Sequence, residues 1–323
     1  EEEALEAAMA SAFEGDFAPP PAIATPHHMN GAIALYLERC LETVGTDIDF
    51  SGLKIVLDCA HGAAFEVGPA ALRQLGADIT IIGDTPDGLN INAGVGSTAT
   101  GLLKSTVTET GADIGIAFDG DADRVIVIDE LGEEVDGDQV MALIAGELHR
   151  AGRLKGGGMV ATIMSNMGLA EYLKGLDLTL ARTKVGDRYV GEHMRQHGFN
   201  LGGEQSGHII LSDVSTTGDG LLAALQVLKT LASSDRPASS IMRVFEPAPQ
   251  ELVNIPFNGS NPLESSGVGD ALTQADELLG ERGRMVVRKS GTEPLIRVMA
   301  EALDEELMHR ALSLVVAAVQ AEA

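Results

Sequence analysis

The stretch Asp113-Ile-Gly-Ile-Ala-Phe-Asp-Gly-Asp-Ala-Asp-Arg-Val-Ile-Val-Ile-Asp129 decides the fold of this 323-residue chain. Two apolar runs rich in isoleucine and valine, at 113–118 and 125–129, predict buried strands. Between them, three carboxylates alternate with small residues. The stretch therefore predicts a strand, an acidic loop and a second strand.

Predicted helices and strands alternate on both sides of this stretch. Upstream, helices are expected at 33–44, 67–75 and from about 98 to 110, with strands at 54–59 and 78–82. Downstream, helices are expected at 138–150, 169–174, 187–197 and 219–232, strands at 159–164, 178–183 and 209–211, and a Gly-rich loop at 202–207. This alternation predicts two consecutive α/β units of about 110 residues each.

The pattern changes after the polar, Pro-containing stretch 233–249. Strands are expected at 251–255, 284–288 and 295–301, followed by a terminal helix from Asp304 with one apolar face. Residues 1–20 begin as an acidic, Ala-rich stretch and end at the three prolines Pro19, Pro20 and Pro21, as expected for a helix and linker after another domain. We therefore predict a linker at 1–30, α/β domains at 31–133 and 134–245, and a smaller α+β domain at 246–323.

The composition limits the classes of partner. The chain has 22 basic and 48 acidic residues, a net charge of −26, which argues against nucleic acid or an anionic membrane as partner. It contains no apolar run of about 18 residues and no signal-peptide pattern at its start. Two cysteines, Cys40 and Cys59, are too few for a disulfide framework. We expect a cytoplasmic protein.

The three carboxylates of the acidic loop, Asp119, Asp121 and Asp123, predict a site for a hard cation such as Mg²⁺ or Ca²⁺. A solvated acidic turn would give the same pattern. An EF-hand fails because Arg124 occupies the position that requires glycine and strands flank the loop. An aspartate nucleophile of the phosphatase type stays open, and Arg124 suits phosphate chemistry in either case.

Three further loops carry polar groups suited to a phosphosugar. Gly203-Glu-Gln-Ser-Gly-His208 can bind sugar hydroxyls, although it could equally be an ordinary turn. Arg288-Lys-Ser-Gly-Thr-Glu-Pro294, with Arg297 after it, has the guanidinium and hydroxyl groups of a phosphate cradle, or is a solvated basic loop. Lys184-Val-Gly-Asp-Arg188 opens a predicted helix and could hold an anion, or be a plain turn.

In this order, the motifs resemble those of the α-D-phosphohexomutases, most closely the phosphoglucosamine mutase branch, from about Ile33 onward. Four further motifs carry the resemblance to that branch: Asp58-Cys-Ala-His-Gly-Ala63, Gly88-Leu-Asn-Ile-Asn92, Lys184-Val-Gly-Asp-Arg-Tyr-Val190 and Thr216-Thr-Gly-Asp-Gly220. The chain departs from the family pattern at Val95, at Ala122, where many relatives have glycine, and at Gln205, where this branch commonly has asparagine.

The resemblance implies a four-domain enzyme of which this chain holds domains two to four. It implies that Asp119, Asp121 and Asp123 bind Mg²⁺ and that Arg124 and His208 lie at the reaction centre. It also implies that the substrate is bound by Glu204, Ser206, Lys184, Arg188, Arg288, Ser290, Gly291, Thr292 and Arg297.

The implied reaction interconverts glucosamine 6-phosphate and glucosamine 1-phosphate through a phosphoserine and a sugar bisphosphate. The phosphoserine loop belongs to the first domain, which we expect to be missing, so we expect the chain alone to be inactive. The partners expected are a phosphosugar and that domain. The alternatives are a phosphomannomutase or phosphoglucomutase, or a non-catalytic module that binds a phosphosugar or Ca²⁺.

Overall fold

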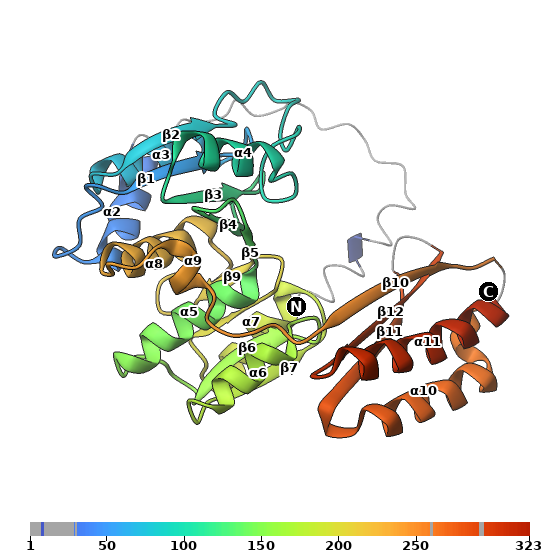
Figure 1. Ribbon diagram of the computed structural model, residues 1–323. Helices are drawn as coiled ribbons and strands as arrows, with labels where there is room; N and C mark the ends of the chain where they lie inside the picture. Colours follow the sequence, from blue (N-terminus) through green and yellow to red (C-terminus); the bar gives the residue numbers. More distant parts are fainter. Residues whose placement is uncertain (1–7, 10–28, 30, 259–260, 291–293) are drawn as a thin grey trace. The chain divides into compact units, whose positions relative to one another are not determined.

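The computed structural model describes residues 8, 9, 29, 31–258, 261–290 and 294–323 (Figure 1). The chain divides into two compact units, residues 1–35 and residues 36–323, and all three β-sheets belong to the second. The linker expected at 1–30 lies outside the described residues, apart from residues 8, 9 and 29. Within the described ranges, none of the helices combines the length and apolar character needed to cross a bilayer.

The first sheet has the strand order β2-β1-β3-β4-β5. Its strands are β1 (Lys54–Asp58), β2 (Asp78–Ile82), β3 (Ile114–Phe118), β4 (Val125–Asp129) and β5 (Glu134–Val135). The first three are parallel, β4 pairs antiparallel with β3, and β5 pairs antiparallel with β4. Its helices are α2 (Ala32–Val44), α3 (Ala64–Gln74) and α4 (Gly101–Thr110). β3 and β4 are buried at every position, which explains their continuous apolar sequence.

The second sheet has the order β7-β6-β8-β9. Its strands are β6 (Gly158–Thr162), β7 (Thr179–Thr183), β8 (Leu201–Gly203) and β9 (Ile209–Leu211), and its helices are α5 (Gly137–Arg150), α6 (Met167–Lys174), α7 (Asp187–His197), α8 (Gly220–Ala232) and α9 (Ala238–Met242). β6 pairs in parallel with β7 and β8, so the carboxyl ends of these three strands meet at one edge. In open α/β sheets this edge is where ligands bind.

The first two α/β units share one apolar core. Helix α8 contacts β3 and β4 of the first sheet as well as β9 and α5 of its own unit. Its buried leucines belong to the same cluster as Phe118 and Val125, which flank the acidic loop. The acidic loop is therefore held beside the second unit by apolar packing.

The third sheet, β10-β12-β11, is antiparallel. It consists of β10 (Gln250–Pro256), β11 (Gly283–Lys289) and β12 (Leu295–Ala302), with η1 (Pro262–Glu264), α10 (Ser266–Leu279), η2 (Gly280–Arg282) and α11 (Glu305–Glu322). Both long helices cover the same face (Figure 1), packing on Ile296, Val298 and Ala300 of β12. Because side chains alternate along a strand, Arg297, Met299 and Glu301 lie on the opposite face.

The predicted fold class, two α/β units followed by a smaller α+β unit, is confirmed. The predicted loop at 202–207 is wrong at its start, because Leu201–Gly203 form β8. Gly202 and Gly203 are required there by close packing, since a Cβ on Gly203 would collide with the carbonyl oxygen of His208. Helix α3 begins at Ala64, three residues before the predicted start, and β5, α9 and α10 were not predicted.

Candidate active site

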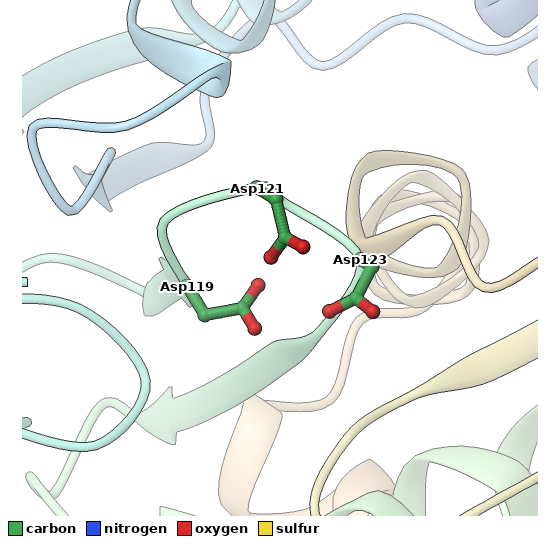
Figure 2. A group of neighbouring side chains, drawn as sticks. All are labelled: Asp119, Asp121 and Asp123. Atoms are coloured by element: carbon green, nitrogen blue, oxygen red, sulfur yellow. The ribbon is translucent and has the colours of Figure 1, made fainter. Parts of the chain in front are cut away.

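The acidic loop between β3 and β4 brings its three carboxylates together. Figure 2 shows Asp119, Asp121 and Asp123 with their carboxylates turned toward a common point. Each offers an oxygen that lies within 4.8 Å of the oxygens offered by the other two. The three side chains therefore converge, as the sequence predicted.

Backbone hydrogen bonds hold the acidic loop in place. Gly220 N–H donates to the carbonyl of Ala122 at 2.9 Å, and Ala63 N–H donates to that of Gly120 at 2.8 Å. Ala122 itself has a φ of +62°, in the left-handed region that favours glycine. The alanine at this position therefore carries a backbone cost that glycine would avoid.

The electrostatics of the acidic loop fit a cation. Burial raises the pKa of Asp119 to about 6, with a further rise from the nearby carboxylates of Asp123 and Asp121. Arg124 Nε lies 3.7 Å from a carboxylate oxygen of both Asp119 and Asp123. Oδ1 of Asp123 is buried and makes no hydrogen bond to any described residue. Three crowded carboxylates with an unsatisfied oxygen are a donor set suited to a hard cation.

The loop 204–208 between β8 and β9 contacts the acidic loop directly. His208 pairs with Arg124 as a β-bridge, and its ring Nδ1 lies 3.0 Å from Oδ2 of Asp123. Val125 N–H donates to the carbonyl of Gly207 at 3.1 Å. Gly207 has a φ of +92°, and a Cβ there would collide with the carbonyl of Val125. Only glycine therefore allows the two loops to approach this closely.

The other side chains of the loop 204–208 point in different directions. Glu204 Oε1 accepts a hydrogen bond from Gly186 N–H at 2.9 Å, which ties it to the loop after β7. Ser206 is exposed. Gln205 turns away from both, donating to Asp136 Oδ2 at 3.2 Å. The side-chain amide of Gln205 is therefore engaged by the protein itself.

The loop after β7 lies at the same sheet edge and carries Lys184, and Arg188 follows it in the first turn of α7. Both residues are exposed, and Lys184 Nζ lies 5.9 Å from the centre of the Tyr189 ring. Through the Gly186–Glu204 hydrogen bond, this loop is joined to the loop 204–208. The two groups of candidate substrate residues are thus adjacent.

The phosphate-cradle residues lie on β11 and β12. Arg288 and Arg297 are directly opposite each other across the two strands. Like charges in this arrangement repel, and an anion between them would relieve the repulsion. Ser290 is buried, and its N–H donates to the carbonyl of Leu295 at 2.8 Å. Gly291 and Thr292 lie outside the described residues.

Comparison with known families identifies three consecutive domains. Models of the phosphoglucomutase/phosphomannomutase family match residues 34–132 (α/β/α domain II), 136–248 (α/β/α domain III) and 252–318 (C-terminal domain).

Comparison with individual proteins gives the same family. A phosphoglucosamine mutase of Hyphomonas neptunium is 70% identical over 322 residues, covering 100% of this chain and 72% of that protein. A phosphoglucosamine mutase of Phenylobacterium zucineum is 52% identical over 316 residues, covering 98% and 70%.

Solved structures share the fold. A phosphoglucomutase/phosphomannomutase family protein of Burkholderia thailandensis matches with a TM-score of 0.72 at 24% identity, covering 90% of this chain and 64% of that one. The N-acetylphosphoglucosamine mutase of Aspergillus fumigatus, solved with GlcNAc-6P and magnesium, matches with a TM-score of 0.68 at 24% identity, covering 88% and 70%. At this identity the likeness shows the fold.

Proposed function

The chain belongs to the phosphoglucosamine mutases of the phosphoglucomutase/phosphomannomutase family, and from this we propose that it binds the metal and the substrate for the interconversion of glucosamine 6-phosphate and glucosamine 1-phosphate. Phosphoglucosamine mutases are isomerases. The chain spans 72% of the Hyphomonas relative and 64% of the Burkholderia structure, so the activity of the whole enzyme is part of the proposal.

One observation carries the proposal, namely the contact between the acidic loop and the loop 204–208. A phosphoryl transfer to a sugar hydroxyl requires the metal and the sugar to be adjacent. The 3.0 Å contact between Asp123 and His208 joins those two loops, and so does the β-bridge between Arg124 and His208. A solvated acidic turn, or a metal site far from any ligand loop, would not need this contact.

The acidic loop would hold the metal. Asp119, Asp121 and Asp123 offer converging oxygens, and Asp123 has an oxygen without a hydrogen bond among the described residues. Mg²⁺ bound there would neutralise negative charge on the phosphoryl group during transfer. Arg124, close to two of these carboxylates, would contribute positive charge to the same group.

The remaining residues would bind and orient the sugar phosphate. Glu204 and Ser206 would pair with sugar hydroxyls, since a carboxylate accepts and a hydroxyl both donates and accepts. Lys184 would approach the substrate from the neighbouring loop, and Arg188 from the first turn of α7. Five residues would hold the phosphate that does not react: Arg288, Ser290, Gly291, Thr292 and Arg297. A bisphosphate intermediate could then present either phosphate to this cradle.

Sugar specificity tests the proposal. The purified chain with Mg²⁺ should bind glucosamine 6-phosphate at least about tenfold more tightly than mannose 6-phosphate in calorimetric titrations, a difference of about 1.4 kcal/mol. A preference for mannose 6-phosphate would instead assign the chain to the phosphomannomutases.

The cytoplasmic location stays a prediction from the sequence.

A further inference from the structure

Two charged side chains of the third sheet bond to the segment that follows β6, one to the loop 163–166 and the other to the first residue of α6. Arg284 on β11 donates to the carbonyl of Ile163 at 2.6 Å and to that of Ser165 at 2.5 Å. Glu301 on β12 accepts from Met167 N–H, the first residue of α6, at 2.5 Å. Arg284 Nε and Glu301 Oε2 are 2.6 Å apart, so the two side chains form an ion pair within the third-sheet domain, and both members bond to the preceding α/β domain.

This ion pair is buried, which makes its geometry specific. Glu301 is fully buried and only 21% of the Arg284 side chain is exposed. Every bond of such a pair must be satisfied, because an unpaired buried charge is costly. Glu301 also places a carboxylate at the N-terminus of α6, where the helix dipole favours negative charge. The pair therefore binds at one well-defined position beside the loop 163–166.

The loop 163–166 is fixed equally firmly from its own domain. Arg182 on β7 donates to the carbonyl of Ser165 at 2.6 Å. Asp138 on α5 accepts from Asn166 N–H at 2.8 Å. The side chain of Asn166 exchanges two hydrogen bonds with the backbone of Ala248, just before β10. A loop held at so many backbone groups is a rigid support.

The same face of β11 and β12 carries the phosphate cradle. Three cross-strand pairs follow one another on this face: Arg284 with Glu301, Val286 with Met299, and Arg288 with Arg297. The first and third pairs are four residues apart, about 13 Å along the strands. The ion pair and the cradle are thus two ends of one short, hydrogen-bonded ladder.

The middle of this ladder also meets the loop. Met164 lines a small gap of about 40 Å³ together with Leu252, Val286, Arg288, Arg297 and Met299. The loop 163–166 therefore faces the ladder from the ion pair up to the cradle. It follows β6, whose neighbours β7 and β8 lead into the loops of Lys184 and Glu204.

We propose that Arg284 and Glu301 are positioning residues that set the distance between the phosphate cradle and the sugar-binding loop 204–208. The proposal rests on the function proposed above. The pair fixes the ladder against the carboxyl end of β6. The sugar-binding loop 204–208 follows β8, the adjacent strand of the same sheet. The affinity for a ligand that must contact both the cradle and the loop 204–208 therefore depends on the position set by this pair. The affinity for a ligand that contacts the cradle alone does not.

The test compares three variants of the full chain. Arg284→Met removes the guanidinium, Glu301→Gln keeps an acceptor for Met167 N–H but removes the charge, and Arg282→Met is the control, an exposed arginine two residues away. Affinities for glucosamine 6-phosphate and for inorganic phosphate are measured by NMR titration. We expect the first two variants to bind glucosamine 6-phosphate at least tenfold more weakly and phosphate within threefold of wild type, and Arg282→Met to match wild type.

A second readout reports the geometry without any ligand. Spin labels at Gln274 on α10 and Gln196 on α7, both exposed, give the distance between the two domains, and both native cysteines are buried. We expect the distance distribution to broaden in Arg284→Met and Glu301→Gln. Unchanged distances, or equal losses for both ligands, would overturn the proposal. Failure of the wild-type chain to bind glucosamine 6-phosphate would overturn the proposed function instead, and the distances would still decide whether the pair sets the geometry.

Discussion

Nδ1 of His208 lies 3.0 Å from Oδ2 of Asp123, although 85 positions separate the two residues in the sequence. The His208 ring is buried, and a Cβ on Gly218 would collide with it. Two loops from different domains are therefore locked together through one imidazole. Carboxylate–histidine contacts of this kind orient metal ligands, so we expect His208 to position Asp123.

Removing this imidazole should weaken metal binding. His208→Ala should lower the affinity for Mg²⁺ by about 10–100-fold, the range for lost outer-shell partners. Asp121→Asn, which removes a proposed ligand, should also bind more weakly, and Asp276→Asn on α10 should bind like wild type. Calorimetric titration with Mg²⁺ measures all four proteins. Wild-type affinity in both His208→Ala and Asp121→Asn would refute the metal assignment.

The left-handed residue in the acidic loop should be improved by glycine. Ala122 has a φ of +62°, so Ala122→Gly should raise the free energy of unfolding by up to about 1 kcal/mol. The matched control is Ala317→Gly on the exposed face of α11, which should lower it by about 0.5–1 kcal/mol. Urea unfolding compares the two. Destabilisation by Ala122→Gly would show that the alanine carries no strain.

A buried carboxylate should make stability depend on pH. Burial raises the pKa of Asp138 from 3.8 to about 7. The folded state thus binds the proton of Asp138 more tightly than the unfolded chain does. This tighter binding adds to the free energy of unfolding in full below about pH 4, and the contribution is lost as the pH rises toward 7. Asp138→Asn cannot ionise, so it should be more stable than wild type at pH 8, with the difference vanishing near pH 4. A less stable variant at pH 8 would mean that the carboxylate is held ionised, with Arg182 as its nearby cation.

The chain by itself should not turn over its substrate. We assign none of its serines as phosphoryl donor, because Ser206 and Ser290 belong to the sugar and phosphate loops. With Mg²⁺, glucosamine 6-phosphate and a sugar bisphosphate, a coupled assay should detect no product above background. Clear turnover would contradict this, and mass spectrometry would then locate the phosphorylated residue.

Local patterns predicted most of the secondary structure and the acidic loop. The bounds of β1, β4 and β9 were predicted to within a residue or two, because each strand is a short apolar run between turns. Helix α3 was predicted from residue 67, but it begins at Ala64 and continues through Pro69. Proline is a probable rather than a fixed stop, and the packing of α3 on β2 outweighs it here.

Contacts between distant residues could not be predicted from the sequence. Nothing in the spacing of Asp123 and His208 shows that their loops meet. Gln205 belongs to the sugar-loop motif, yet its side chain bonds Asp136. Arg284 and Glu301 read as ordinary strand residues, because their pairing depends on the register of β11 and β12. Charged residues at inward strand positions were the one available signal.

The central claim is that this chain holds both ends of a glucosamine phosphate, and titration of glucosamine 6-phosphate into the wild-type chain and Arg288→Ala with Mg²⁺ tests it most directly. We predict one-to-one binding by wild type, weakened by about 1.5–3 kcal/mol in Arg288→Ala, the scale of a lost hydrogen bond to a charged group. Glu204→Ala should weaken the binding of glucosamine 6-phosphate but not that of inorganic phosphate. Lys289→Ala, which removes the neighbouring cation, should change the affinity for neither ligand. Binding of glucosamine 6-phosphate that is equal in wild type and Arg288→Ala would contradict the claim.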